Sequence, residues 1–255
     1  MAKLIQPSEF SWGVEIECVA PRSVVSDGEI YIGDYHDSEA LPYPFPDSFS
    51  AKTDGSIQWD YGFDGEDCEV ISEPFYGSEG LPPLFDTIRR LKLLGCITNS
   101  SCGLHVHVGI SSLLRELSGS DSFNIEEHLP ELLRRTVRLM LLHEADILAV
   151  TSKSRYGNSY CYSIKQSWPR YLRYLEPDVS GRFSLAKYVA DEMGRYYSLN
   201  VSNIDNSRKW TLEFRLFPSF LNCSLIAGYI QLALGICHKA IAMERLPSRD
   251  KIQAR

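Results

Sequence analysis

Three apolar segments of the chain carry ionisable side chains at every second position, at residues 13–18, 103–108 and 211–216. Because alternate residues of a strand point to opposite faces, this period of two predicts three β-strands. One face of each strand is apolar and packs on a core. The other face carries Glu15, Glu17, His105, His107, Glu213 and Arg215. If the three strands share one sheet, its polar face is suited to hold cations and phosphates.

A period near 3.6 predicts helices at residues 81–95, 126–150, 184–194 and about 220–245. Short strands are expected at 56–59 and 68–72, around a glycine-containing turn. Strand pairs with helices between distant strands favour an α+β fold over a doubly wound parallel sheet. No boundary is evident, so we expect one domain over residues 1–255. Residues 21–46 lack periodicity and are rich in Asp, Ser, Pro, Gly and Tyr, so we interpret them as a loop insertion or lid.

Composition narrows the classes of protein. The chain has 255 residues, a hydrophobic fraction of 44% and a net charge of −7, which favours a globular protein without a general polyanion-binding surface. Seven cysteines without a CxxC pair, and no evident signal peptide, predict free thiols and a cytoplasmic location. The uncharged stretch at 216–237 contains proline and polar residues, so we expect a buried helix rather than a membrane span.

Further carboxylates lie near apolar sequence, at Asp54, Glu69 and Glu73. Glu69 and Glu73 share one face of the predicted strand. Burying several like charges is costly unless cations or hydrogen bonds compensate. Carboxylates joined by one or two imidazoles suit Mg²⁺ or Mn²⁺ better than Zn²⁺. Each pair of ionisable residues two positions apart is also expected on the exposed face of a sheet. Only the occurrence of all the pairs in one chain favours a functional site.

The segment 99–103 consists of small residues and leads directly into the histidine strand. Small residues let backbone N–H groups approach an anion or a substrate carboxylate, which makes Ser101 and Gly103 candidate binding residues. An ordinary turn after the preceding helix explains the same sequence. Cys102 does not support a zinc site, because no third zinc-type ligand appears.

The order of five motifs resembles a known family. G-x-E-x-E, D-G-S, E-V-I-S-x-P, S-x-G-L-H-V-H-V-G and T-x-E-F-R-L-F follow one another between Gly13 and about Phe217. This order is similar to that of the amidoligases, which belong with glutamine synthetase and γ-glutamylcysteine ligase to the carboxylate–amine ligase superfamily. The resemblance implies a glutamine synthetase catalytic-domain-like fold. That fold is a curved antiparallel half-funnel with helices on its outer face, two or three Mg²⁺ or Mn²⁺ ions, and ATP.

The resemblance also implies roles for single residues. Ligands of an ion at the nucleotide phosphates would be Glu15, His105 and Glu213. Ligands of an ion nearer the acceptor carboxylate would be Glu17, Asp54 and Glu69. Arg215 would contact the transferred phosphate, and His107 would face the nucleotide or support the site. Weaker signatures suggest substrate or nucleotide contacts for Arg155, Tyr160, Arg195 and Asn200.

The expected reaction joins a carboxylate to an amine through an acyl phosphate, at the expense of ATP. Glu73 is a candidate to accept the amine proton, because it shares a face with Glu69. Three alternatives stay open: a phosphagen-type phosphotransferase, a metal-dependent hydrolase and a non-catalytic ligand-binding protein. Expected partners are small-molecule or peptide carboxylates and amines, with no membrane; nucleic acid is not indicated, although a modified nucleobase remains among the substrates. The sequence leaves the oligomeric state open.

Overall fold

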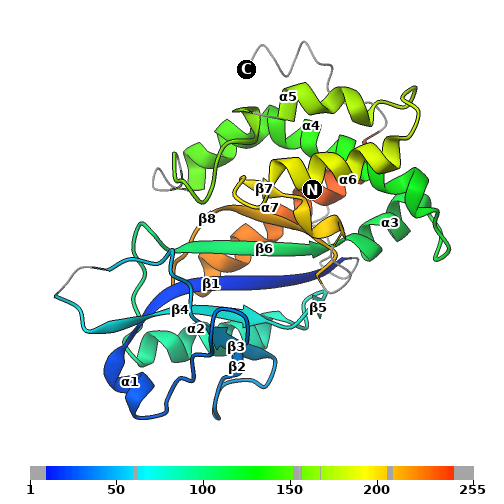
Figure 1. The fold of residues 1–255 in the computed structure, drawn as a ribbon. Helices are drawn as coiled ribbons and strands as arrows, with labels where there is room; N and C mark the ends of the chain where they lie inside the picture. Colours follow the sequence, from blue (N-terminus) through cyan, green and yellow to red (C-terminus); the bar gives the residue numbers. More distant parts are fainter. Residues whose placement is uncertain are drawn as a thin grey trace.

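The strands form one open antiparallel sheet (Figure 1). The computed structural model describes residues 10–59, 62–151, 155, 157–166, 168–205 and 209–243. The strand order is β2-β3-β4-β1-β6-β8-β7, and β5 pairs with β1. The strands are β1 Ser11–Pro21, β2 Glu39–Ala40, β3 Phe49–Lys52, β4 Gly65–Ser72, β5 Phe75–Tyr76, β6 Gly103–Gly109, β7 Leu199–Asn200 and β8 Thr211–Pro218. The longest strand, β1, therefore lies inside the sheet between β4 and β6.

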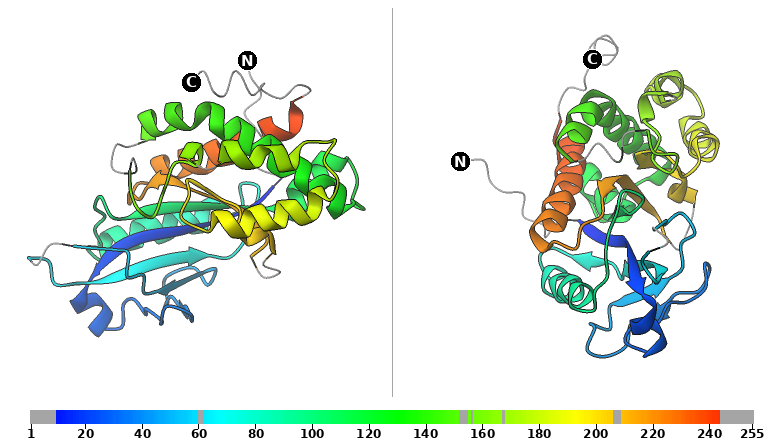
Figure 2. Two further views of the ribbon diagram at one scale, coloured as in Figure 1. Left: turned by 45° about the horizontal axis from the view of Figure 1, so that its top comes forward. Right: turned by 90° about the vertical axis from the view of Figure 1, so that its left-hand side faces the viewer.

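Helices form the second layer. They are α1 Arg22–Ser26, α2 Leu81–Leu93, α3 Ile110–Ser118, α4 Ile125–Thr151, α5 Trp168–Tyr171, α6 Arg182–Met193 and α7 Cys223–Ala242. Single 3-10 turns occur at Ile164–Gln166, Leu172–Leu175 and Ser202–Asp205. Helices α2 and α7 lie side by side against one face of the sheet (Figure 2), and α4 packs against α7 and α6. The polar side chains of the strands lie on the opposite face of the sheet.

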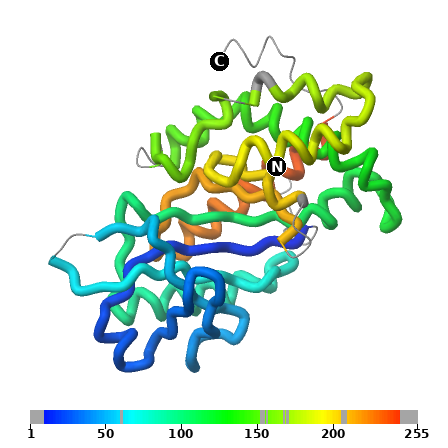
Figure 3. Tube along the Cα trace, viewed as in Figure 1, coloured from blue at the N-terminus to red at the C-terminus, as the bar shows by residue number. Residues whose placement is uncertain are grey.

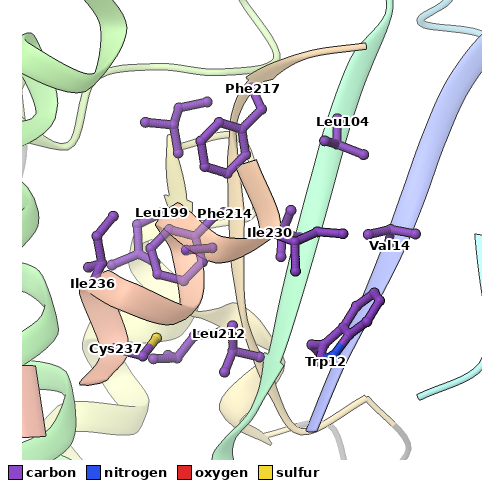
Figure 4. Close-up of a cluster of buried hydrophobic side chains, with 14 of the residues drawn as sticks. Trp12, Val14, Leu104, Leu199, Leu212, Phe214, Phe217, Ile230, Ile236 and Cys237 are labelled. Carbon is purple, nitrogen blue, oxygen red and sulfur yellow. The ribbon is translucent and has the colours of Figure 1, made fainter. Parts of the chain in front are cut away.

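The apolar face of the sheet packs against α7. Figure 4 shows Val14, Leu104 and Leu212 on adjacent strands, with Ile230 and Cys237 of α7 facing the sheet. All five side chains are buried. The alternation at residues 13–18, 103–108 and 211–216 is therefore confirmed as three strands of one sheet with an apolar inner face.

The predicted α+β class is confirmed, and so are four helices and the strand at 68–72. The half-funnel curvature and the glutamine synthetase-like relation stay predictions. The predicted strand at 56–59 is wrong. The Asp54 side chain accepts a hydrogen bond from the Ser56 N–H at 2.8 Å, which closes a turn instead, and β3 is the strand that pairs with β4. The end of the last predicted helix, at 245, lies outside the described residues.

Residues 21–46 are more ordered than a plain loop. They contain α1 and β2, and Ile30, Leu41 and Phe45 are buried in the core. Figure 3 shows the segment following the edge of the sheet formed by β2 and β3. Its assignment as a lid stays a prediction, as does the single domain over 1–255.

By length and composition, α7 is a helix that could cross a bilayer, and it is the one such helix found in the described part of the chain. In the fold it packs against β6 and α4. Ile226, Ile230 and Leu234 are among its buried side chains. These contacts agree with the buried helix predicted from the uncharged stretch.

Glu131 of α4 is the centre of an ion-pair network on the helical layer. Its carboxylate lies 2.8 Å from Arg134 Nη2, 2.7 Å from Arg135 Nε and 3.3 Å from Arg182 Nη2. Partial burial acts to raise the pKa of Glu131, but Arg135 and Arg134 outweigh it and hold the pKa below the ordinary value of 4.5. The ionised carboxylate therefore stabilises the fold at pH values above 4.5.

Glu131→Gln should lower the free energy of unfolding by about 1–2 kcal/mol at pH 7, because hydrogen bonds to a charged group are lost. A carboxyl with a lowered pKa loses its contribution as pH falls through that pKa. The difference from wild type should therefore shrink below about pH 4.5, the ordinary value for this carboxyl. Urea unfolding at several pH values measures this. Glu116→Gln, at an exposed position of α3, is the matched control. A difference that persists unchanged at pH 3 would contradict the assignment.

Candidate functional site

Strand register brings the predicted polar side chains together on one face of the sheet. Glu15 of β1 lies opposite His105 of β6, and Glu17 lies opposite Glu69 of β4. On the other side of β6, His107 lies opposite Glu213 of β8. Side chains directly opposite in an antiparallel pair have Cβ atoms about 5 Å apart. The three predicted strands and β4 thus build one cluster.

The two histidines lie among the carboxylates. His105 Nδ1 is 2.9 Å from Glu15 Oε2 and 3.5 Å from Glu213 Oε1, and its Nε2 is 3.2 Å from Glu17 Oε1. His107 Nε2 is 3.3 Å from Glu15 Oε1, and its Nδ1 is 2.9 Å from Thr211 Oγ1. Neither Nε2 atom makes a hydrogen bond, although both are buried. Each of these nitrogens lies beside a carboxylate but does not form a hydrogen bond with it. Such an imidazole nitrogen and carboxylate could instead bind the same cation.

Glu213 and Arg215 form the β8 side of the cluster. Arg215 Nη1 lies 2.5 Å from Glu213 Oε1, and Nε donates to the Tyr160 carbonyl at 3.3 Å. The other carboxylate oxygen, Glu213 Oε2, accepts a hydrogen bond of 2.6 Å from Asn200 Nδ2. Arg215, Glu213 and Asn200 are all buried residues. Arg215 is therefore held in place by contacts on two sides.

Glu17, Asp54 and Glu69 form the other end of the cluster. The Gly103 N–H donates to Glu17 Oε2 at 2.5 Å, and Lys52 Nζ lies 3.1 Å from Glu69 Oε1. Asp54 joins them from the turn after β3. This end therefore contains three carboxylates, with His105 Nε2 beside Glu17 and Lys52 beside Glu69.

The pKa values differ between the two ends. Burial acts to raise the pKa of Glu15 and of Glu213. His107 together with Lys209 and His105 at Glu15, and with Arg215 and His105 at Glu213, outweighs burial, and the pKa of each carboxyl falls below its ordinary value. At Glu17 and Glu69 burial prevails and raises the pKa; the charge of Glu15 adds to the rise at Glu69. At the Glu17–Glu69 end the neighbouring cations therefore do not offset the cost of burying the ionised carboxylates.

Among the residues that the structure describes, three sets of side chains have ligand atoms within 4.8 Å of one another: Glu15 with His107 and Glu213, Glu15 with Glu69 and His105, and Glu17 with Asp54 and Glu69. The third set is the predicted acceptor-side set. The first pairs His107, rather than His105, with Glu15 and Glu213. These carboxylate-rich sets have the ligand chemistry of Mg²⁺ or Mn²⁺. Together with the cost of burial that the neighbouring cations leave at Glu17 and Glu69, this ligand chemistry fits divalent ions.

Two cavities adjoin the cluster and share Glu15, Lys52 and Lys209 in their walls. The larger, of about 520 Å³, is lined by the aromatic residues Tyr76 and Trp210, with Arg115 and His107 also in its walls. The polar cavity measures about 100 Å³ and is lined by Tyr35, Asp54, Glu69, His105, Arg195, Asn200, Ser202, Asn203, Glu213 and Arg215 as well. The metal-ligating sets therefore lie between an aromatic space and a small charged one.

Some predicted site residues lie elsewhere. Glu73 is exposed beyond the end of β4 and lines neither cavity, because the strand ends at Ser72 and the alternation does not continue. Ser101 exchanges hydrogen bonds with the backbone of Gln58, so it ties two turns together. Tyr160 contributes only its carbonyl to Arg215. These positions give no support to the predicted contacts of the three side chains with substrate.

Gly103 and Arg155 lie beneath the cluster rather than in a cavity wall. The Arg155 guanidinium is buried and donates to the Arg215 carbonyl at 3.0 Å. A Cβ atom at Gly103 would lie 2.8 Å from Arg155 Nη2. The two residues therefore support Glu17 and Arg215 from behind.

Sequence reasoning missed Lys52, Lys209 and Tyr35. Lys209 Nζ lies 3.1 Å from Glu15 Oε1, and Lys52 contacts Glu69 at the same distance. The short strand of Lys52 and the turn of Lys209 carry no motif. Only the register of β3 against β4, which places Lys52 opposite Glu69, reveals its position.

Comparisons with known proteins add little to this geometry. No family model matches the sequence, and no curated protein matches it. Among solved structures, the chain is similar to a bifunctional glutathione synthetase from Pasteurella multocida, with 12% sequence identity and a TM-score of 0.49. The match covers 98% of this chain and 40% of that one, so the chain spans about two fifths of the neighbour's length. The likeness is too low to assign a family or a function, which leaves the chemistry of the site as the basis for both.

Proposed function

We propose that the protein is an ATP-dependent carboxylate–amine ligase that forms an amide bond through an acyl phosphate. One observation carries the proposal. Five carboxylates and two imidazoles meet at ligand spacing beside Arg215, between two cavities of different character. Such a cluster can neutralise a polyphosphate and a carboxylate at once, which is what the first step of this reaction requires. The order of the sequence motifs agrees with the same reaction.

The larger cavity is the proposed nucleotide site. Its aromatic walls suit a base, and its volume of about 520 Å³ lies in the range of small-molecule sites. Lys209 and His107 line the end that adjoins Glu15. The phosphates would therefore point from this cavity toward the cluster, and the acid would lie in the polar cavity beyond it.

The ions would be held by two sets of ligands. Glu15, Glu213 and a histidine would hold the ion nearer the nucleotide, and Glu17, Asp54 and Glu69 the other. Bound Mg²⁺ or Mn²⁺ supplies neutralising charge for phosphate and carboxylate oxygens.

The proposed reaction has two steps, and Arg215 acts in the first. The acid's carboxylate oxygen attacks the γ-phosphorus, the bond to the bridging oxygen breaks, and ADP leaves. The amine nitrogen then attacks the acyl carbon, the bond from that carbon to the phosphate oxygen breaks, and the departing phosphate takes the proton that the nitrogen loses. Arg215 would offset the charge of the transferred phosphoryl group, held in place by its contacts with Glu213 and Tyr160. We assign Glu73 no part in the proton transfer, because it is exposed and lines neither cavity.

A two-substrate screen tests the proposal. Purified protein with Mg-ATP is offered panels of acids and amines, and ADP release and product mass are read together. We expect ADP release that requires both an acid and an amine, with an amide as product. Mg-ATP should also raise the melting temperature.

Other outcomes would replace the proposal. ADP release with one phosphorylated acceptor and no amide would indicate a phosphotransferase. Turnover without ATP would indicate a metal-dependent hydrolase. Failure of Mg-ATP to shift the melting temperature would indicate a protein without this activity.

A further inference from the structure

Glu144 is a buried carboxylate outside the candidate site. It belongs to α4, which packs against β8 and against the 3-10 turn Ile164–Gln166. The residue is 2% exposed. Neither cavity at the candidate site is lined by Glu144, and none of the three metal-ligating sets includes it. Because a buried carboxylate is costly unless hydrogen bonds or cations compensate, its contacts indicate its role.

Three hydrogen bonds satisfy the carboxylate of Glu144. Its Oε1 accepts from the Ile164 N–H at 3.0 Å and from the Ser198 hydroxyl, and its Oε2 accepts from the Ser163 hydroxyl. Hydrogen bonds to an ionised acceptor are stronger than those between neutral groups. The donors come from two segments, residues 160–164 and residues 196–198. One carboxylate therefore ties α4 to both segments.

The two segments also pair with each other. The Tyr162 N–H donates to the Tyr196 carbonyl at 2.7 Å, and the Ser198 N–H donates to the Tyr162 carbonyl at 2.8 Å. These bonds belong to a parallel bridge between Tyr162 and Tyr197. A short parallel pair is weak by itself. The bonds to Glu144 Oε1, one from each segment, therefore strengthen their association.

Each of the two segments holds Arg215 through a backbone carbonyl. Arg215 Nε donates to the Tyr160 carbonyl at 3.3 Å. The Arg215 backbone N–H donates to the Ser198 carbonyl at 2.9 Å. The first segment thus orients the guanidinium, and the second fixes the main chain that carries it. Glu144 reaches Arg215 through these two carbonyls.

Resting on the proposed function, we propose that Glu144 is a positioning residue for Arg215. It holds the two segments in register, so that the guanidinium points to where the transferred phosphoryl group would lie. A displacement of about 1 Å at an active site can cost about 100-fold in rate. Helix α4 then contributes to the reaction although none of its residues lines the two cavities.

Hydrogen exchange tests the positioning without any turnover. Glu144→Met keeps the length of the side chain but removes all three acceptors. We expect the amides of residues 196–200 and 211–216 to exchange about tenfold faster in this variant. The amides of β4, at residues 65–72, should keep their protection and show that the sheet is intact. Unchanged exchange at 196–200 and 211–216 would overturn the proposal.

The conservative variant Glu144→Gln should restore the wild-type behaviour. The glutamine carbonyl can accept from the Ile164 N–H and the Ser198 hydroxyl, and the amide group can donate to the Ser163 hydroxyl, which accepts as well as donates. We therefore expect exchange within about twofold of wild type, on the reasoning that all three bonds remain. Exchange as fast as in Glu144→Met would overturn the assignment of these three bonds as the cause.

Kinetics separate positioning from a general loss of structure. The amide-forming kcat of Glu144→Met should fall about 100-fold, while KM for Mg-ATP changes by less than about threefold. A double-mutant cycle with Arg215→Met isolates the route. In a protein that already lacks the guanidinium, Glu144→Met should lower kcat little further. An equal loss of kcat with and without Arg215 would contradict action through Arg215.

Ser198→Ala decides the case in which Glu144→Met does not fold. It removes one of the three hydrogen bonds and leaves the carboxylate in place. Exchange at 196–200 should rise and kcat should fall, both in the direction expected for Glu144→Met. No change in either would overturn the proposal. Glu127→Gln, at an exposed position of α4, is the matched control and should alter neither measurement.

The failure of this proposal and that of the proposed function have different signatures. If amides form and Glu144→Met leaves exchange at 211–216 unchanged, the positioning is wrong and the ligase stands. If no acid and amine give an amide while Glu144→Met loosens 211–216, Glu144 holds Arg215 as described and the ligase is wrong.

Discussion

Glu69→Gln should stabilise the protein in the presence of a chelator and at the same time abolish its response to Mg²⁺. Glu69 is buried, and burial with the neighbouring charges of Glu15 and Asp54 raises its pKa well above the ordinary value, although Lys52 opposes this. Folding therefore disfavours the ionised carboxylate. A glutamine of the same shape removes that cost and can still accept a hydrogen bond from Lys52.

The pH dependence has a defined sign. A carboxyl with a raised pKa in the fold costs stability as pH rises from the ordinary value of 4.5 toward the raised one. Wild type and variant should therefore be similar below pH 4.5. Near pH 7 in EDTA we expect the variant to be more stable by about 1–3 kcal/mol. Thermal unfolding at several pH values measures the difference.

Activity should change in the opposite direction. A catalytic ion contributes several kcal/mol to the stabilisation of developing charge, and each 1.4 kcal/mol is a factor of ten in rate. We expect the amide-forming rate of Glu69→Gln to fall at least 100-fold, and its Mg²⁺-dependent rise in melting temperature to disappear.

Glu66→Gln is the matched control for Glu69→Gln. Glu66 lies on the same strand, is partly exposed and contacts Arg22 at the surface. Its replacement should leave both stability and Mg²⁺ response nearly unchanged. If Glu69→Gln keeps the full Mg²⁺ response, Glu69 is not a ligand.

Gly103→Ala should destabilise the protein by about 1–3 kcal/mol, the usual range for overpacking a filled interior. Its Cβ would lie 2.8 Å from Arg155 Nη2 and 2.9 Å from Nη1. Arg155 is buried, and its hydrogen bond to the Arg215 carbonyl holds it in place. Relief of the clash would shift Glu17 or Arg215, so activity should fall even at temperatures where the variant stays folded.

Gly228→Ala is the control for Gly103→Ala. A Cβ at Gly228 of α7 meets no atom within 4 Å, and alanine favours a helix by about 1 kcal/mol over glycine. This variant should be slightly more stable than wild type. Unfolding in urea compares the two, and equal stability of both variants would contradict the packing described for Arg155.

The core of the candidate site could be predicted because alternation is a local property of the chain. Glu15 and Glu17 share a face in any strand, whatever its partners, and so do His105 and His107. Register is not local. The sequence could not show that Lys52 lies opposite Glu69, nor that Tyr35 meets Arg195. These contacts depend on how distant segments pair.

The errors have the same origin. Glu73 follows the alternation of β4 in sequence, but the strand ends one residue earlier and the side chain is exposed. Residues 56–59 have the composition of a strand, but the Asp54 side chain closes a turn there. Strand-like composition predicts a strand only weakly. A side chain that accepts a hydrogen bond from a nearby backbone N–H can favour a turn instead.

The central place of β1 in the sheet has a consequence for folding kinetics. Glu15 meets His105 across 90 residues of sequence and Lys209 across 194. Contacts between such distant residues form only after large loops have closed, and chains dominated by them fold slowly. A nascent or truncated chain that ends before β8 lacks Glu213 and Arg215 altogether. The candidate site can therefore bind its ligands only after the whole sheet has formed. Ligand binding then measures the fraction of molecules that are fully folded.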